Sequence, residues 1–300
     1  MPRNNLFKRN TFNLTLLLIL IAVYWIFMLP GYRVAIDFPY TSQDSLKVGF
    51  NIPQLWSERS AEGLGAYVGL TLWSWPLDFL YGLSSSLGLN FSLLERLLGV
   101  FGVAILGFFS INKFLKEKGI GPVGRFIGVL FFLTNTYVLL LIDGGQFSIA
   151  LAYSIFPLVF LKVEEAIGSA LKAKVLAALF ISILGFFDIR FVYVLAVVLF
   201  LKFIYEFLFV TKDRFKYLLS WIKTTAVLIL VFIGLNFYWI LPVVISRSSP
   251  SGWISLNLSE ATLTAFVNLG HSLFVLQPHW FKNVFGKITP LKPEFVLIPV

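Results

Sequence analysis

Four aspartates stand at or near the ends of long apolar segments, where a carboxylate can act as a general base. Asp37 and Asp44 follow the first apolar segment, while Asp143 and Asp188 lie in short turns between later ones. Asp37 comes only seven residues after its segment, so chain length keeps it near that segment's end. It lies between an isoleucine and a phenylalanine, and partial desolvation raises the basicity of a carboxylate. An ordinary solvated loop residue is the alternative interpretation for each acid.

Two arginines at the ends of apolar segments could hold a phosphate. A guanidinium group carries a permanent charge and matches the geometry of phosphate oxygens. We therefore predict Arg190 and Arg247 as substrate-binding residues, together with Asp143, Gln146 and Asp188 in neighbouring turns. Snorkelling of the arginines to the membrane edge is the competing interpretation.

Metal ligands and nucleophiles are scarce. The 300-residue chain has no Cys, which excludes disulfides, thiolate metal sites and cysteine nucleophiles. Its two histidines, His271 and His279, are eight residues apart, too far for a helical i, i+4 metal pair. We therefore predict no metal site and no required cofactor, with a divalent cation left as an open alternative. The motifs of P-loop ATPases, serine hydrolases and zinc proteases are absent from the sequence.

The elements that must position these residues are membrane-spanning helices. Hydrophobic residues make up 58% of the chain, charged residues 13%, and the mean hydropathy is +0.86, which leaves too little polar surface for a water-soluble protein. Unbroken runs of Leu, Ile, Val and Phe predict helices rather than a β-barrel, so the predicted fold class is an all-α polytopic membrane protein. The predicted apolar segments are 13–30, 93–112, 126–142, 147–162, 174–187, 191–210 and 224–245.

Charge asymmetry predicts the orientation of these spans. Segment 65–83 is apolar but carries Asp78, Pro76 and a tryptophan pair at 73 and 75. If this segment crossed the membrane, the basic loop 113–125 would lie outside, contrary to the positive-inside tendency. We therefore expect 65–83 to be an interfacial or re-entrant helix. The prediction is a multi-pass plasma-membrane protein with a cytoplasmic N-terminus. The net charge of +9 is then an orientation signal, and no nucleic-acid partner is expected.

The organisation expected from this topology is a single transmembrane domain, 1–300, with outer loops 31–92 and 246–292. The second loop is rich in apolar residues, and we expect it to fold over the outer face. A further apolar run begins after Pro293, so we expect the chain to be the N-terminal part of a longer protein. Within the spans, Asn135 and Asn236 are expected to form hydrogen bonds between helices, and Lys202 to pair with Glu206.

The order of these segments resembles the N-terminal membrane region of the GT-C glycosyltransferases, specifically the α-(1→3)-arabinofuranosyltransferase type. The resemblance covers roughly residues 10–165 and begins with one span, an outer loop with Asp37 and Pro53-Gln54-Leu55-Trp56, and the stretch 63–89 with its glycines and proline. Its later motifs are Leu94-Glu95-Arg96-Leu97, Leu133-Thr134-Asn135-Thr136-Tyr137, Gly144-Gly145-Gln146, and Ala150-Leu151-Ala152-Tyr153 through Pro157.

This resemblance implies a GT-C-like transmembrane helix bundle that transfers a sugar on the outer face. The implied donor is a polyprenyl- or dolichyl-phosphate sugar held with membrane lipid, and the implied acceptor is a glycan or glycoprotein. In that family a carboxylate of the first outer loop is the proposed base, which corresponds to Asp37, with Asp44 as the second choice. Two alternatives remain open: a non-catalytic membrane scaffold or accessory subunit of an envelope complex, and a transporter or lipid flippase.

Overall fold

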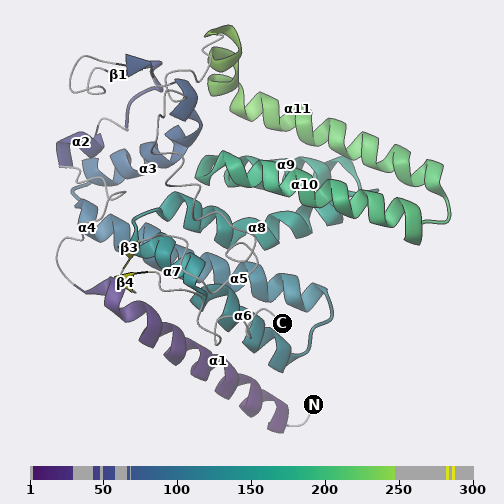
Figure 1. The fold of residues 1–300 in the computed structure, drawn as a ribbon, viewed down its shortest axis with the longest axis horizontal. Helices are drawn as coiled ribbons and strands as arrows, with labels where there is room; N and C mark the ends of the chain where they lie inside the picture. Colours follow the sequence, from purple (N-terminus) through teal and green to yellow (C-terminus); the bar gives the residue numbers. More distant parts are fainter. Residues whose placement is uncertain are drawn as a thin grey trace. The chain divides into compact units, whose positions relative to one another are not determined.

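The computed structural model describes residues 3–29, 43–47, 50–57, 66–67, 69–246, 282–283 and 286–287, and these residues are almost entirely helical (Figure 1). This confirms the predicted all-α class. The α-helices are α1 (Arg3–Tyr24), α2 (Gln43–Lys47), α3 (Trp75–Ser86), α4 (Phe91–Leu94), α5 (Gly102–Glu117), α6 (Pro122–Thr134), α7 (Thr136–Asp143), α8 (Phe147–Ala166), α9 (Leu171–Phe187), α10 (Ile189–Tyr205) and α11 (Arg214–Ser246).

Shorter elements connect or extend these helices. Segments of 3-10 helix cover Trp25–Met28 and Gly69–Ser74, and π-helical segments cover Glu95–Phe101 and Glu206–Val210. Two antiparallel pairs of two-residue strands complete the described structure: β1 (Trp56–Ser57) pairs with β2 (Ala66–Tyr67), and β3 (Lys282–Asn283) pairs with β4 (Gly286–Lys287).

Five helical stretches of the described residues are long and apolar enough to cross a membrane, so the chain is a membrane protein. They are Phe91–Glu117, Pro122–Asp143, Phe147–Ala166, Ile189–Val210 and Arg214–Ile245. The shorter apolar helix Leu14–Met28 and the 17-residue α9 match the remaining predicted segments. All seven apolar segments predicted from the sequence are therefore helical within the described residues. Segment 65–83 is different, because it contains the 3-10 segment and part of the 12-residue α3 and is not among the five candidate spans.

Asn135 divides the predicted segment 126–142 into α6 and α7. Its backbone is extended, with ψ of 156°, and its side-chain oxygen accepts a hydrogen bond from the Val138 N–H at 3.1 Å. The amide nitrogen of the same side chain donates to the carbonyls of Phe131 and Phe132, at 3.1 and 2.8 Å. The side chain thus satisfies backbone groups at the end of one helix and the start of the next. These bonds connect the end of α6 with the start of α7.

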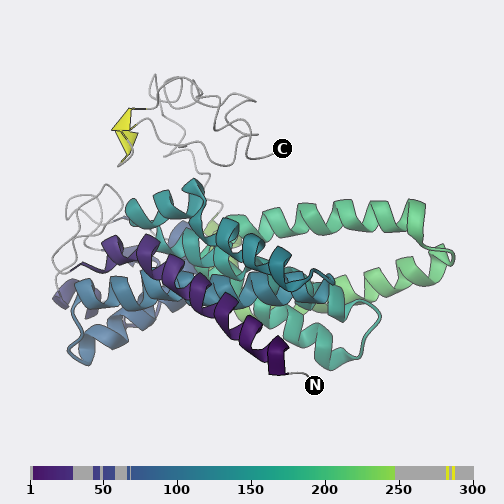
Figure 2. The same cartoon turned by 90° about the horizontal axis from the view of Figure 1, so that it is seen from below.

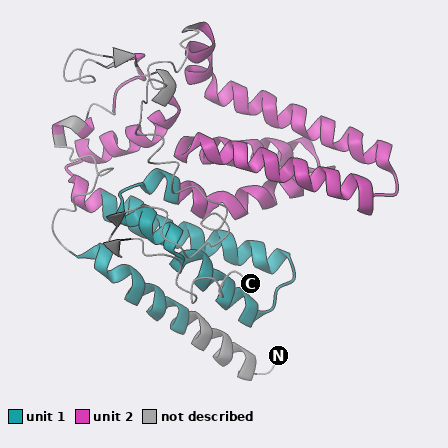
Figure 3. Ribbon diagram, viewed as in Figure 1, with its two compact units in different colours: residues 1–40, 95–150, 248–300 teal, residues 41–94, 151–247 magenta. Residues whose placement is uncertain are grey.

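The chain forms two compact units, which Figure 3 distinguishes by colour. Unit 1 comprises 1–40, 95–150 and 248–300, and unit 2 comprises 41–94 and 151–247. In unit 1, α6 packs against both α1 and α5. Its core contains Leu16 of α1, Ile111 of α5, and Val129 and Leu133 of α6. The Tyr24 hydroxyl donates to the Leu133 carbonyl at 2.8 Å, which ties the end of α1 to α6.

In unit 2, α9 packs against both α10 and α11. Small residues on α9, including the fully buried Ala177 and Ala178, allow close approach of neighbouring backbones. The Asn236 side chain on α11 donates to the Ser182 hydroxyl on α9 at 3.3 Å, and it accepts from the Trp239 indole N–H at 2.9 Å. The predicted interhelical role of Asn236 is therefore confirmed.

Candidate functional site

Asp78 in the first turn of α3 is the centre of the candidate site. The preceding segment Gly69–Ser74 ends where Pro76 helps to start α3, because a proline near the first helical position lacks a hydrogen-bond donor that the helix could not use. The Ser74 hydroxyl donates to the Asp78 carboxylate at 3.1 Å, one helical turn away. This bond fixes one carboxylate oxygen.

Aromatic side chains gather around this part of α3. The Trp75 ring lies 5.4 Å from the Phe79 ring and 5.7 Å from the Tyr238 ring, measured between centroids, and Phe79 stacks on Phe50 at 5.1 Å. The Trp75 indole donates to the Asn51 carbonyl at 2.8 Å. We call Phe50, Trp75, Phe79 and Tyr238 the aromatic cluster. It joins the start of unit 2 to α11.

The surroundings of Asp78 shift its protonation equilibrium towards neutral pH. Desolvation by the groups packed around the carboxylate raises its pKa from 3.8 to about 6, and the hydrogen bond from Ser74 works in the opposite direction. Part of the residue remains exposed to solvent in the isolated chain, so the carboxylate stays within reach of a ligand. A group with a pKa near 6 exists in both forms near neutral pH, as acid–base catalysis requires.

Asp188 and Arg190, predicted separately as substrate-binding residues, form one unit at the start of α10. The Asp188 side chain is fully buried and caps α10 by accepting a bond from the Arg190 backbone N–H at 2.8 Å. The Arg190 guanidinium also binds this carboxylate, with Nε 2.9 Å from Oδ1 and Nη2 2.5 Å from Oδ2. The Arg190 side chain nevertheless remains 68% exposed. The buried acid thus holds an exposed guanidinium at the helix start.

The Asp78 site and the Asp188–Arg190 pair lie at the same end of unit 2. The Tyr238 hydroxyl donates to the Trp73 carbonyl at 3.2 Å, next to the start of α3. Two residues earlier on α11, Asn236 contacts Ser182 of α9, and α9 ends five residues later at Phe187. The segment Gly69–Ser74 packs against both α9 and α11. Asp188 directly follows that end of α9, so an acid near neutral pKa and an exposed arginine share one end of the unit.

The other predicted site residues lie outside the described residues or away from the Asp78 site. Asp37 and Arg247 lie outside the described residues, as do His271, His279 and most of loop 246–292. Asp44 is in α2, where its exposed carboxylate pairs with Lys47 at 3.5 Å. Such a surface pair contributes little to stability.

Asp143 and Gln146 flank the turn between α7 and α8 in unit 1. The Gln146 N–H donates to the Leu141 carbonyl at 2.8 Å, and Gly145 has φ of +79°, as in the glycine termination of a helix. The structure therefore places this pair in one unit and the Asp188–Arg190 pair in the other. Among the residues described, no cluster of three His, Asp or Glu side chains suits a metal ion.

The Leu94-Glu95-Arg96-Leu97 motif contributes a buried ion pair to unit 1. The Arg96 Nη1 lies 3.3 Å from the Glu95 carboxylate, and both side chains are at least nine-tenths buried. The Arg96 guanidinium also donates to the Leu29 carbonyl at the end of the segment that follows α1. The pair lies in the π-helical segment Glu95–Phe101 and joins two spans of unit 1.

Sequence reasoning noticed Asp78 but did not select it as a site residue. Its mid-segment position suggested only a headgroup-layer helix. The available signal was an ionisable residue inside an apolar stretch, which is a functional hypothesis by itself in a membrane protein. The part of α11 that contacts this region, at Tyr238, follows it by more than 150 residues in the sequence. Such a contact could not be predicted from the sequence.

Comparison of the chain with protein-family models, with curated proteins and with solved structures finds no match.

Proposed function

We propose that the chain is the membrane part of a glycosyltransferase that uses a polyprenyl- or dolichyl-phosphate sugar as donor. The acceptor is a hydroxyl group of a glycan or glycoprotein. In the reaction, a carboxylate takes the proton from the acceptor hydroxyl. At the same time the oxygen of that hydroxyl forms a bond to the anomeric carbon. The bond between that carbon and the phosphate oxygen breaks, and the lipid phosphate leaves with the electron pair. Attack opposite the leaving group inverts the anomeric centre.

The observation that carries this proposal is the Asp78 carboxylate beside the aromatic cluster. A pKa of about 6 leaves Asp78 largely ionised at neutral pH, yet more basic than an ordinary aspartate. The faces of aromatic rings carry partial negative charge, which attracts the C–H edges of a sugar ring. Trp75 and Tyr238 therefore suit a sugar held next to this base.

Arg190 suits the leaving phosphate in this proposal. Its guanidinium is exposed, carries a permanent charge and is oriented by the buried Asp188. It lies at the same end of unit 2 as Asp78. A phosphate bound there would meet donors whose orientation is already fixed, although Asp188 offsets part of the positive charge.

The resemblance to the GT-C glycosyltransferases supports the same reaction class. Asp78 belongs to the predicted outer loop 31–92, as do Asp37 and Asp44, so three aspartates compete for the role of base. Asp44 is exposed and paired with Lys47. Desolvation raises the pKa of Asp78 to about 6, which favours it as the base.

The test uses the full chain in lipid nanodiscs with a panel of polyprenyl-phosphate sugars and measures release of polyprenyl phosphate. Asp78→Asn keeps the shape of the side chain and a hydrogen-bond acceptor for Ser74. We expect it to lower kcat by about 10²- to 10⁴-fold, the usual contribution of a general base. The rate should also rise with pH up to about 6 and level off above it, because the base must be ionised.

Parallel Asp37→Asn and Asp44→Asn variants complete the test. If Asp37→Asn alone abolishes release, the reaction class stands and the role of Asp78 falls. If all three variants keep wild-type release, or if no donor is consumed by the wild-type protein, the enzymatic proposal falls in favour of a scaffold or accessory subunit.

A further inference from the structure

A groove between α10 and α11 is a second feature of unit 2, and its role does not depend on the proposed reaction. The two helices join at 211–213 and diverge away from this turn (Figures 1 and 2). Between them runs a groove of about 600 Å³, with Ile181 of α9 and Val163 of α8 among the residues of its wall. Ala196 and Phe203 line it from α10, and Leu218 lines it from α11.

The groove is apolar and is longer than the hydrocarbon layer of one membrane leaflet. Its lining on α11 runs from Leu218 to Phe232, which corresponds to about 21 Å along the helix axis. One leaflet contributes about half of a hydrocarbon core roughly 30 Å thick. A lipid chain that entered at the joined end would therefore find apolar side chains along its whole depth.

The joined end of the groove carries positive charge. Arg214 lies four residues before Leu218, so it is on the same face of α11 as the groove lining. Its guanidinium lies over the Phe207 ring, 5.8 Å from the centroid, and donates to the Leu208 carbonyl at 3.4 Å. Lys212 is two residues earlier in the exposed turn.

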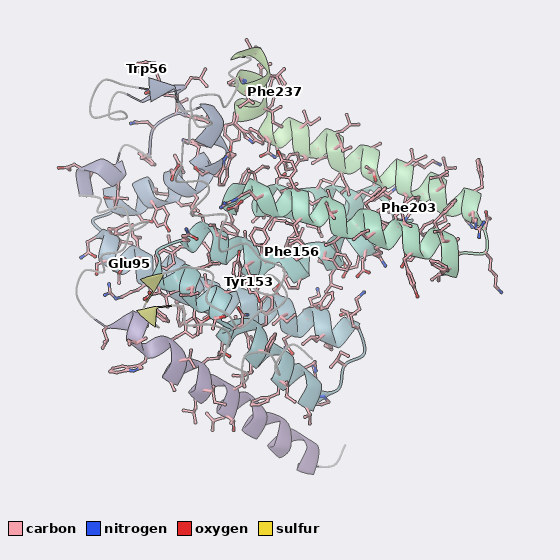
Figure 4. All side chains as sticks on the ribbon, viewed as in Figure 1. Trp56, Glu95, Tyr153, Phe156, Phe203 and Phe237 are labelled. Atoms are coloured by element: carbon pink, nitrogen blue, oxygen red, sulfur yellow. The ribbon has the colours of Figure 1, made fainter. Side chains whose placement is uncertain are left out.

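Glu164 of α8 and Glu206 after α10 already have a basic partner. Lys202 contacts Glu164 at 2.9 Å and also pairs with Glu206, which confirms the pair predicted from the sequence. The Tyr217 hydroxyl donates to the second oxygen of Glu206 at 2.5 Å, and the Tyr217 ring stacks on Phe203, which Figure 4 labels. At the joined end, Asp213 lies between Lys212 and Arg214 and accepts a hydrogen bond from the Lys216 N–H at 3.1 Å. With Lys216, this end carries three basic residues and one acid, so its net charge is positive.

We propose that this groove binds one anionic phospholipid, with an acyl chain between α10 and α11 and the phosphate at Arg214. Charge complementarity selects an anionic lipid over a zwitterionic one, because basic residues near the membrane surface attract acidic headgroups.

Native mass spectrometry of the full chain tests the site, with phosphatidylglycerol and phosphatidylcholine as the two probes. Ala196→Trp fills the groove, and its matched control, Val197→Trp, adds the same side chain to an exposed position that does not line it. We expect wild-type protein and the control to retain phosphatidylglycerol, and the Ala196→Trp variant to lose it. Melting temperatures of both variants check that they fold.

A second pair of variants tests the headgroup contact without changing the groove. Arg214→Gln removes the charge on the groove face, while Lys216→Gln removes an equal charge two residues later on a different face of α11. We expect Arg214→Gln to weaken phosphatidylglycerol binding about fivefold, the usual effect of one basic residue at the membrane surface, and the control to change it little. Equal retention of both lipids by the wild-type protein, or equal effects within either pair, overturns the proposal. A dimer that Ala196→Trp alone disrupts would overturn it too, since a second copy would then occupy the groove.

Discussion

Replacing Asp78 by Asn should stabilise the protein at neutral pH and leave its stability unchanged in acid. The folded-state pKa of Asp78 is raised from 3.8 to about 6, so the folded chain favours the protonated carboxyl group. Well below pH 3.8 the group is protonated in both states and costs nothing. As the pH rises from 4 through 6, the folded state must hold a desolvated charge, and the wild-type protein loses stability that the Asn variant retains.

The size of this effect follows from the shift. About two pH units correspond to about 3 kcal/mol at full desolvation. Because part of Asp78 is exposed, solvent screening reduces this to about 1 kcal/mol. A change of that size moves the melting temperature by about 2 to 4 °C for a chain of this length class.

Thermal unfolding in detergent at pH 4, 6 and 8 measures the difference. The Asn variant should melt with the wild-type protein at pH 4 and above it at pH 8. Asp44→Asn is the control, since it removes an exposed carboxylate whose surface pair with Lys47 contributes little to stability. A constant difference between Asp78→Asn and wild type at all three pH values would refute the reasoning. A variant that gains stability and loses turnover would be typical of a functional site that is maintained at a cost to stability.

Three further predictions concern packing and topology. Asn236→Leu should lower the melting temperature, because it removes the hydrogen bonds to Ser182 and Trp239. A double-mutant cycle with Ser182→Ala should give a coupling energy of about 0.6 kcal/mol. A coupling energy of zero would contradict the contact between α9 and α11. Gly99→Ala should destabilise unit 1 by about 1 to 3 kcal/mol in chemical denaturation, because a Cβ there would lie 2.6 Å from the Phe147 ring. An unchanged stability would mean that the ring moves freely. Lys118→Cys in this Cys-free chain should resist an impermeant thiol reagent in intact cells, and labelling from outside would invert the predicted orientation.

The helices could be predicted from the sequence because composition alone determines them. Long apolar runs in lipid must satisfy their backbone groups internally, so each run becomes a helix whatever its neighbours are. The break at Asn135 is different, since it depends on whether the asparagine caps a new helix or continues the existing one. An asparagine followed by a threonine is compatible with either choice, so the apolar pattern around it predicted one continuous segment.

The candidate site was harder to predict because its contacts join distant parts of the chain. The pairing of Asp188 with Arg190 is local, and the Asp-x-Arg spacing at a helix start could have suggested a cap that also binds the arginine. The burial of Asp188 could not be inferred, because it depends on how α9 and α10 pack. The surroundings of Asp78 depend on Tyr238, which follows it by more than 150 residues. The sequence reveals the acid at 78 but not the aromatic cluster that forms around this part of α3.

The lengths of the helices in unit 2 keep its two proposed sites on opposite sides of the membrane. Helix α10 and the π-helical segment after it run from Ile189 to Val210, and 22 residues at 1.5 Å each span about 33 Å. This matches a hydrocarbon core roughly 30 Å thick, so Arg190 at one end and Arg214 just past the other face opposite membrane surfaces. The positive-inside tendency predicts that the basic segment 212–216 lies in the cytoplasm, where anionic lipids are concentrated, and that the Asp78 site lies outside. Substitutions at Arg214 should therefore change lipid retention without changing the pH dependence that Asp78 imposes, and a variant that altered both would show that the two ends of α10 are coupled.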